Sequence, residues 1–333
     1  MTVSIARRKF VVALGGAAAC PLAAGAQQRA MPVIGFLGTT SPDTYAQRVS
    51  RIKRGLADTG FVEPRNVRSE YRWANGQYDR LPALAMDLVR QQPAVVMTLP
   101  ASATLAAKAA TTTIPIVFSI GGDPVKQLGL VASYNKPGGN LTGVTFFTAE
   151  LWGKRLEIMR EIVPSANVMA VLTNPKGPGT ERATKEVQEA GRLLGLQTFI
   201  LRASTEPEID AAFASLVQRR ARALLIQAEP FLHEHRDQIV ALAAQHSIPA
   251  CYPLPEHSIA GGLVSYGISR ANSADLDRQM GIYAGRILKG EKPGDLPIIQ
   301  PTRFELVINL KAAKALNLEI PPLVRALADE VIE

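Results

Sequence analysis

A carboxylate stands just beyond an apolar run in the segment IVFSIGGDPV, residues 116–125. The run predicts a buried strand, and Asp123 follows it after Gly121 and Gly122. In that position Asp123 could neutralise the ammonium group of a ligand, or it could cap a helix that begins at Pro124. The two glycines could equally mark only a tight turn. The segment matches neither the G-x-x-x-x-G-K-S/T nor the G-x-G-x-x-G pattern of phosphate-binding loops.

Hydroxyl side chains follow other apolar runs in the same way. Thr39, Thr40 and Ser41 come after the first run, and Ser102 and Thr104 come after the third. In open parallel sheets, ligands lie beyond the carboxyl ends of the strands and near helix N-termini. Hydroxyls and free backbone N–H groups in such places favour an anionic group such as a ligand carboxylate. Ser102 and Thr104 are equally suited to capping a helix.

The second half of the chain repeats the pattern with other side chains. Asn174 and Glu229 follow two apolar runs, and Phe231, Tyr252 and Tyr266 stand near the ends of strands. These aromatic rings could stack on an apolar or aromatic ligand, or they could pack in the core. The ligand-binding residues that we predict are Thr39, Thr40, Ser41, Ser102, Thr104, Gly121, Gly122, Asp123, Asn174, Glu229, Phe231, Tyr252 and Tyr266.

Patterns that would indicate catalysis or metal binding are weak. His233 and His235 are two residues apart, so on a helix they point in different directions. No H-E-x-x-H, C-x-x-C or G-x-S-x-G pattern occurs, and Cys251 stands in an apolar strand where a buried thiol is expected. We predict a protein that is not an enzyme, with no catalytic residues, no metal and no cofactor.

The elements that must position these residues alternate from residue 31 onward. Near-continuous apolar strands such as AVVMTLP are separated by helical segments such as YDRLPALAMDLVRQ, which predicts parallel sheets covered by helices on both faces. The alternation restarts near residue 150, which indicates an α/β fold of two doubly wound lobes. We predict one lobe from residues 31–144 and 270–297 and another from 145–269 and 298–333, joined by a hinge of extended segments.

The N-terminus has the three parts of an export signal. Arg7, Arg8 and Lys9 precede a Gly/Ala-rich apolar run that ends in Ala24-Gly25-Ala26. The paired arginines predict a twin-arginine signal cleaved near Ala26, and hence export to the periplasm. A membrane anchor is the alternative, although the run is shorter than the roughly 20 residues that a span needs.

Composition narrows the class of partner. The formal charge of +8 falls to 8 − 3 = +5 once the signal is removed, and the basic residues are scattered rather than clustered. We therefore predict no nucleic-acid partner. Only Cys20 and Cys251 occur, so the mature chain cannot form an internal disulfide. Cys20 is a conceivable lipidation site, but Ala17 to Ala19 before it lack the usual leucine, which disfavours lipid attachment.

Several longer segments carry a family resemblance. GGDPV…GLV followed by PGGNLTGV, together with EYRWANGQYDRLPALAMDLV and PTRFELVINLKAAKALNLEIPP, resembles the ABC transporter substrate-binding protein family over nearly all of the mature chain. The similarity is greatest to members related to tryptophan- and other amino-acid-binding lipoproteins. The chain departs from those lipoproteins in its twin-arginine-like signal and in lacking a clear lipidation motif.

This resemblance implies a fold and a mode of action. The fold would be the type I periplasmic-binding fold, which closes two lobes around a small ligand. The protein would be a monomer that delivers an amino acid or related carboxylate to a membrane permease. The alternative is a periplasmic sensor that presents its closed form to a membrane receptor.

Overall fold

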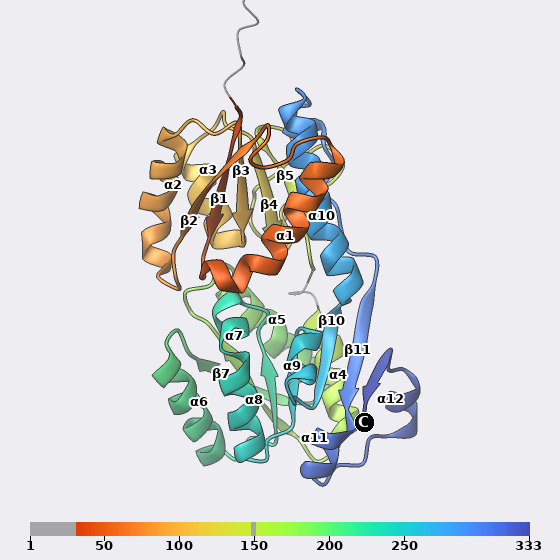
Figure 1. Cartoon of the computed structure of the whole chain (residues 1–333). Helices are drawn as coiled ribbons and strands as arrows, with labels where there is room; N and C mark the ends of the chain where they lie inside the picture. The colour runs from red at the N-terminus through yellow and green to blue at the C-terminus, as the bar shows by residue number, and fades with distance from the viewer. Residues whose placement is uncertain (1–30, 148–150) are drawn as a thin grey trace, which may run out of the picture. The chain divides into compact units, whose positions relative to one another are not determined.

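The computed structural model describes residues 31–147 and 151–333 (Figure 1). The predicted signal sequence with Arg7, Arg8, Cys20 and Ala26 lies outside the described residues. Two sheets organise the described chain, and their helices cover both faces, so the predicted α/β fold with two lobes is confirmed. We call the five-stranded sheet with its helices lobe 1, and the seven-stranded sheet with its helices lobe 2.

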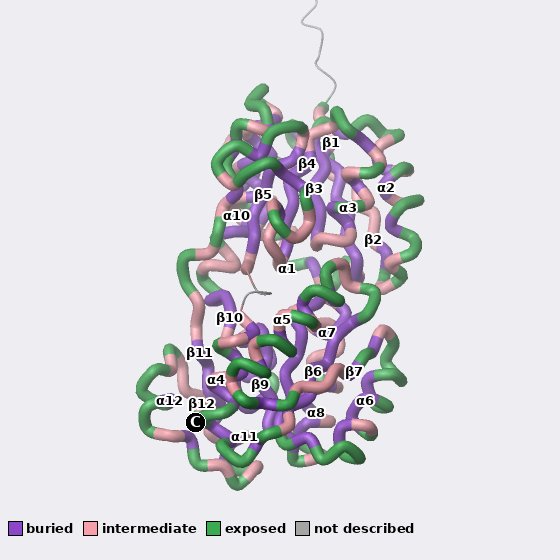
Figure 2. Tube along the Cα trace, turned by 180° about the vertical axis from the view of Figure 1, so that it is seen from behind, coloured by how far each residue is buried: buried purple, intermediate pink, exposed green. Residues whose placement is uncertain are grey.

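Lobe 1 is a wholly parallel sheet in the order β2-β1-β3-β4-β5. Its strands are β1 (Val33–Gly38), β2 (Arg68–Trp73), β3 (Val95–Leu99), β4 (Ile116–Ile120) and β5 (Leu141–Thr145). Its helices are α1 (Pro42–Asp58), α2 (Leu81–Arg90), α3 (Ala101–Ala110) and α10 (Arg270–Leu288), with a short 3-10 turn, η1 (Tyr78–Arg80). One core lies between the sheet and α1 with α10, and the other lies between the sheet and α2 with α3. The strands are accordingly buried along their length, apart from the edge strand β2 (Figure 2).

Close packing of α1 on α10 fixes the position of α1, which lines the cleft between the lobes. Gly55 of α1 and Gly281 of α10 lie where the two backbones approach each other. A Cβ atom on Gly55 would stand 1.8 Å from the carbonyl oxygen of Arg278, and one on Gly281 would stand 1.9 Å from that of Ile52. Only glycine permits this approach, because any side chain would force the helices apart.

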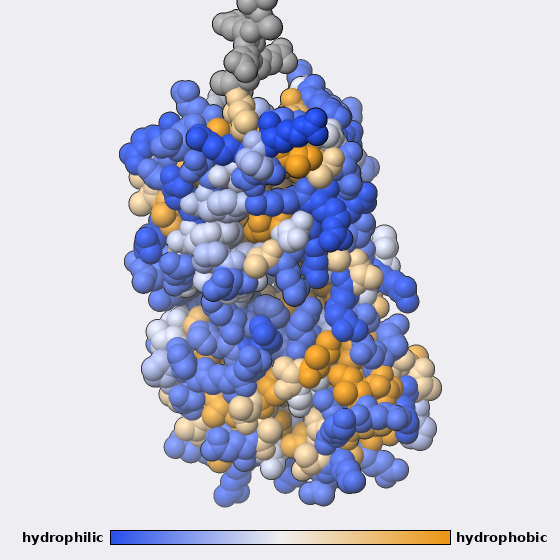
Figure 3. Space-filling view, in the orientation of Figure 1, coloured by the Kyte–Doolittle hydropathy of each residue, from blue (hydrophilic) through white to orange (hydrophobic). Residues whose placement is uncertain are grey.

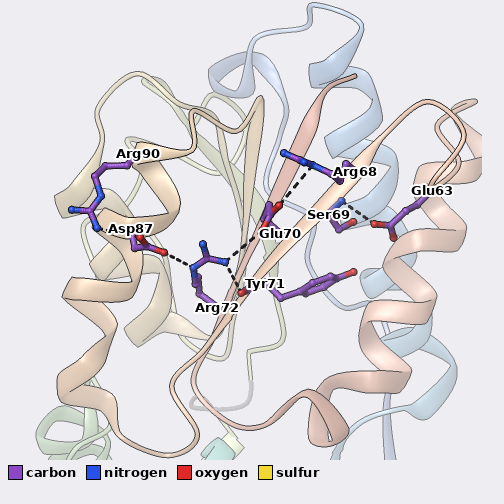
Figure 4. Close-up of polar contacts among 8 residues, drawn as sticks. All are labelled: Glu63, Arg68, Ser69, Glu70, Tyr71, Arg72, Asp87 and Arg90. Atoms are coloured by element: carbon purple, nitrogen blue, oxygen red, sulfur yellow. Dashed lines mark hydrogen bonds and ion pairs between the residues drawn. The ribbon is translucent and has the colours of Figure 1, made fainter. Parts of the chain in front are cut away.

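The edge strand β2 is covered with charge (Figure 4). Glu70 lies 3.7 Å from Arg68 and 3.6 Å from Arg72, and Arg72 also pairs with Asp87 of α2 at 2.6 Å. Charged side chains on an edge strand oppose the addition of a foreign strand. This edge is therefore protected and is not part of the site described below.

Lobe 2 is a mixed sheet in the order β12-β11-β10-β9-β8-β6-β7. Its strands are β6 (Val168–Thr173), β7 (Gln197–Arg202), β8 (Ala223–Ile226), β9 (Ala250–Tyr252), β10 (Val264–Ile268), β11 (Phe304–Asn309) and β12 (Glu330–Ile332). Its helices are α4 (Trp152–Ile162), α5 (Thr180–Leu193), α6 (Glu206–Gln218), α7 (Pro230–Glu234), α8 (Arg236–Gln245), α9 (Pro255–Ile259), α11 (Leu310–Ala315) and α12 (Pro322–Ala326). All neighbouring strands are parallel except β10 and β11.

That antiparallel pair departs from the purely parallel sheet that we predicted. The chain leaves β10 for lobe 1, where α10 packs, and then returns to lobe 2 as β11. A strand that re-enters from the end at which its neighbour left must run in the opposite direction, and no crossover helix on lobe 2 intervenes to reverse it.

The surface of the described chain is mainly hydrophilic on the face that Figure 3 draws. Hydrophilic residues cover most of the face drawn in Figure 3, and hydrophobic residues gather on it near β11 and α12. Within residues 31–147 and 151–333, no helix combines the length and the apolar character that crossing a bilayer requires.

Candidate functional site

A cleft of about 780 Å³ lies between the two lobes. Lobe 1 contributes α1 and the ends of β4 and β5, including Ser119, Gly121 and Phe146. Lobe 2 contributes the segment from Ala228 to Asp237 and the start of α9. Strand ends that meet helix starts are where parallel sheets bind ligands, and this volume is typical of a site for a small molecule.

A smaller cavity of about 90 Å³ adjoins this cleft at the start of α3. Pro100, Gly121, Glu229 and Pro230 line both spaces, so the two lie side by side. No side chain caps the N-terminus of α3, and the Oγ atom of Ser102 is buried without a hydrogen-bond partner among the described residues. The first N–H groups of a helix lack acceptors within it, so this corner can bind an anionic group.

Glu229 connects the cleft to both lobes. It caps α7 by accepting a hydrogen bond from the N–H of Leu232 at 3.3 Å. Its other oxygen accepts a hydrogen bond from the hydroxyl of Tyr78, which belongs to lobe 1. Burial raises the pKa of Glu229 and also that of Tyr78. The side chain is only 7% exposed, so its carboxylate is a strong acceptor for any donor that reaches it.

A second side-chain hydrogen bond joins the lobes nearby. The hydroxyl of Thr44, in the first turn of α1, donates to Oε1 of Glu234 on α7 at 3.0 Å. Both connections therefore end on the same short segment of lobe 2, residues 229–234.

Arg48 of α1 stands on the lobe 1 wall of the cleft. Its Nε and Nη2 atoms donate to Oδ1 of Asp277 at 2.9 and 2.7 Å, and Nη2 also donates to Oγ of Ser119 at 2.6 Å. The guanidinium carbon lies 5.1 Å from the ring centre of Phe146. Burial would lower the pKa of Arg48, but Asp277 raises it by more, so the group stays charged.

Our sequence reasoning missed Arg48, Tyr78 and Asp277. One available signal was the spacing on α1, since Arg48 falls on the same helical face as the buried Tyr45 and Ile52. An arginine in a buried stripe needs a partner, but the partner is distant in sequence and cannot be assigned from spacing.

The predicted residues at the ends of lobe 1 strands make hydrogen bonds within that lobe. Thr39 Oγ1 lies 3.2 Å from the hydroxyl of Tyr45, and Ser41 caps α1 by accepting a hydrogen bond from the N–H of Thr44 at 3.3 Å. Thr104 donates to the carbonyl oxygen of Pro100 at 3.0 Å. Thr40 is fully buried. None of these four predicted side chains lines the cleft or the smaller cavity.

Asp123 makes the local contacts that the capping interpretation required. Its Oδ1 atom accepts hydrogen bonds from the N–H groups of Val125 and Lys126 at 2.7 and 2.9 Å. Burial alone would raise the pKa of Asp123, but these two bonds, together with a hydrogen bond from Tyr134 and the charge of Lys126, lower it. The residues that follow form turns rather than the expected helix, because Gly129 and the paired glycines 138–139 interrupt the segment. Asp123 borders a separate surface depression, while Gly121 and Gly122 line the smaller cavity.

The predicted lobe 2 residues divide in the same way. Glu229 lines the cleft, whereas Asn174 is buried and its Oδ1 atom accepts a hydrogen bond from the N–H of Lys176. Phe231 and Tyr252 are buried in the core of α6 to α8, and Tyr266 packs against the core on the other face of the sheet. The structure thus brings Ser102, Gly121, Gly122 and Glu229 together and places the three aromatic rings apart from them.

The histidines and the thiol of lobe 2 are poorly suited to chemistry. The rings of His233 and His257 lie 5.3 Å apart, and burial lowers the pKa of both, that of His257 to about 3. Burial also raises the pKa of Cys251 to about 12, which keeps the thiol protonated. In the part of the chain that the structure describes, no group of three or more His, Cys, Asp or Glu residues could hold a metal ion.

Comparisons with known proteins concern the family and the fold of the chain. A profile of the family described as "ABC transporter substrate binding protein" matches residues 33–332. A "Tyrosine-binding protein" from Clostridioides difficile strain R20291 is 24% identical over 266 residues, which is 80% of this chain and 75% of that protein. Two solved structures align with 90% of this chain over 99% of their own length.

The first of these structures is a conserved domain protein of Vibrio cholerae, at 22% identity and a TM-score of 0.82. The second is a domain from Streptococcus pneumoniae in complex with L-Trp, at 23% identity and a TM-score of 0.80. At such identities the structural likeness establishes the fold.

Proposed function

Because the chain belongs to the ABC transporter substrate-binding protein family, we propose that it captures an amino acid or a related carboxylate between its lobes and delivers it to a permease. The observation that carries this proposal is the uncapped start of α3, with the buried, unpartnered hydroxyl of Ser102 facing residues of lobe 2 across a small cavity. The relatives that bind tyrosine and L-Trp support an amino acid as the ligand.

The site supplies opposite charges for the two ends of an amino acid. The N–H groups at the start of α3 and the hydroxyl of Ser102 bind the carboxylate. Glu229, which lines both cavities, neutralises the ammonium group. Asp123 remains a second hypothesis for that role, although its Oδ1 already accepts two backbone hydrogen bonds.

Capture works by closure of the hinge. A ligand shifts the population toward the closed state only as far as it binds that state more tightly. Contacts with α3 of lobe 1 and Glu229 of lobe 2 can form together only when the lobes are closed. The protein works as a monomer in the periplasm after cleavage near Ala26, and the permease recognises its closed form.

A ligand screen tests the proposal. The mature chain from Gln27 onward is melted with L-tryptophan, L-tyrosine, L-leucine, aromatic acids, sugars or nucleosides. A ligand at 100 times its Kd should add about 2.7 kcal/mol to the free energy of unfolding. We expect an amino acid or aromatic acid to raise Tm and to be recovered chemically unchanged.

Two variants connect a positive result to the site. Ser102→Ala should weaken the binding of that ligand by about tenfold, the effect of losing one hydrogen bond to a carboxylate. Ser50→Ala, on the exposed face of α1, should bind as the wild type does. Recovery of an altered ligand would refute the binding function, and equal affinity of Ser102→Ala would refute the carboxylate position.

A further inference from the structure

Two guanidinium groups share one carboxylate on the lobe 1 wall of the cleft. Arg48 lies 2.7 Å from Oδ1 of Asp277, and Arg51 lies 3.5 Å from Oδ2 of the same side chain. The Asp277 side chain is 0% exposed, whereas those of Arg48 and Arg51 are 23% and 33% exposed and line the cleft. The three side chains together, two guanidinium groups and one carboxylate, have a net charge of +1.

Acidic and basic side chains line the cleft together. The acidic ones are Asp43, Glu229, Glu234, Asp237 and Glu256, and Arg236 and Arg270 are basic in addition to Arg48 and Arg51. Asp43, Asp237 and Glu256 are exposed, where water and salt screen them, whereas Glu229 and Glu234 accept hydrogen bonds from hydroxyl groups of lobe 1. The excess of positive charge is local: around Asp277, two guanidinium groups pair with one carboxylate.

The arginine is held in a fixed geometry. Three hydrogen bonds to Asp277 and Ser119 engage its Nε and Nη2 atoms, and the rings of Phe146 and Tyr45 lie 5.1 and 5.9 Å from the guanidinium carbon. A buried aspartate paired to an arginine costs desolvation energy that apolar packing would avoid. The contact of α1 with α10 does not depend on it, because that contact is already made by glycines and apolar residues. Because Nε and Nη2 are engaged in this way, a carboxylate or similar anion in the cleft would be bound through the Nη1 atom of this fixed guanidinium group.

His233 offers a matching polar atom from lobe 2. It lines the same cleft, and its Nδ1 atom is buried with no hydrogen-bond partner among the described residues. Burial is the main reason that its pKa is lowered, and Arg48 is among the charges that contribute. An anion between Arg48 and His233 could accept hydrogen bonds from both lobes. Binding of the anion would therefore favour the closed state.

We propose that the ligand carries a second anionic group, which Arg48 binds with the help of His233 while the first carboxylate lies at the start of α3. This inference rests on the proposed function and narrows its substrate class to acidic amino acids and related dicarboxylates. The two cavities share wall residues, so a ligand that occupies both would extend from Ser102 to Arg48.

Matched pairs of probes test the second anionic group. Calorimetric titrations compare L-norleucine with L-2-aminoadipate, and L-phenylalanine with 4-carboxy-L-phenylalanine, which differ only by the terminal carboxylate. In at least one pair we expect the acidic member to bind about 10- to 100-fold more tightly, the span for hydrogen bonds to a charged group. If the neutral members bind as well as the acidic ones, the inference is wrong but amino-acid binding stands. If no member of either pair binds, the proposed function fails with it.

Variants assign the preference to Arg48. Arg48→Gln alone leaves Asp277 buried and unpaired, so the double variant Arg48→Gln/Asp277→Asn, which removes both charges at nearly constant shape, decides the result. We expect the double variant to lose the preference for the acidic member. The control is Arg54→Gln on the same helix, since Arg54 is exposed and lines a groove against α10 instead of the cleft. A preference that survives in the double variant, or that disappears equally in the control, would overturn the assignment.

Discussion

Replacing Tyr78 by phenylalanine should weaken ligand binding without unfolding either lobe. The substitution removes one hydroxyl group. Its hydrogen bond to Glu229 is one of two side-chain hydrogen bonds found between η1 or α1 of lobe 1 and residues 229–234 of lobe 2. The ring itself is retained, so its packing against the core of lobe 1 is preserved. The change therefore isolates a single polar contact between the lobes.

The expected size follows from the burial and charge of the acceptor. Glu229 is 7% exposed, and a hydrogen bond to a charged group contributes about 1.5 to 3 kcal/mol. If the bond exists only in the closed state, its whole free energy appears in ligand affinity, which corresponds to a rise in Kd of roughly 10- to 150-fold. Calorimetry with the best ligand of the screen measures Kd, and stopped-flow fluorescence should show the change mainly in the dissociation rate.

A matched control makes this result specific. The hydroxyl of Tyr283 donates to the carbonyl oxygen of Pro297 at 2.7 Å, and both residues belong to the lobe 1 part of the chain. Tyr283→Phe makes the same chemical change, so it should cost about 1 kcal/mol of stability while Kd stays within about twofold. The reasoning is refuted if Tyr78→Phe binds with wild-type affinity, or if both variants lose affinity to the same extent.

Three further predictions concern other parts of the chain. Asp123→Ala should lower the free energy of unfolding by about 1 kcal/mol through loss of its two hydrogen bonds from backbone N–H groups and leave Kd unchanged, and a tenfold weaker Kd would instead support the ammonium contact. The pKa of His257 is about 3 in the folded protein against 6.5 in the unfolded chain, so the unfolded chain binds more protons between these values and stability falls as pH drops. From pH 7.5 to 5 the loss due to His257 is about 2 kcal/mol, which urea unfolding should show in the wild type and in His246→Gln; in His257→Gln the loss should be smaller by that amount, and the part due to His233 should remain. Gly55→Ala should lower stability by about 1 to 3 kcal/mol, since its Cβ would meet a backbone oxygen of α10 at 1.8 Å, while Gly153→Ala, with nothing within 4 Å, should not.

The sequence was informative about the fold because strand and helix periods are local signals. Near-continuous apolar runs separated by amphipathic helices predicted two α/β lobes, and the two sheets confirm this. Local signals were misleading where the same pattern fits either one long helix or two short ones. The segment 233–246 has a helical pattern throughout, but the structure has two helices, α7 and α8, with a break at His235. Strand order and the direction of β11 depend on where the chain crosses between lobes, which no local pattern specifies.

Prediction of the site was limited by a physical ambiguity at the ends of strands. Hydroxyls such as those of Ser41 and Thr104 satisfy nearby backbone groups or turn toward the interior, and the residue type alone cannot distinguish this from contact with a ligand. The ion pair of Arg48 with Asp277 could not be predicted for a different reason, which is the distance between its members along the chain. Arg48 and Asp277 are 229 positions apart, and the chain has 37 basic and 29 acidic residues, so one sequence allows too many pairings.

Glu229 shows why the choice of residue matters for testing closure. Its carboxylate caps α7, accepts the hydroxyl of Tyr78 from lobe 1 and lines both cavities. A substitution at Glu229 would therefore change the stability of a five-residue helix, the contact between the lobes and the electrostatics of the ligand site together, and such effects are not additive among groups in direct contact. Tyr78 contributes to only one of these three roles through its hydroxyl. Loss of affinity in Tyr78→Phe can therefore be attributed to closure, whereas the same loss in a Glu229 variant cannot.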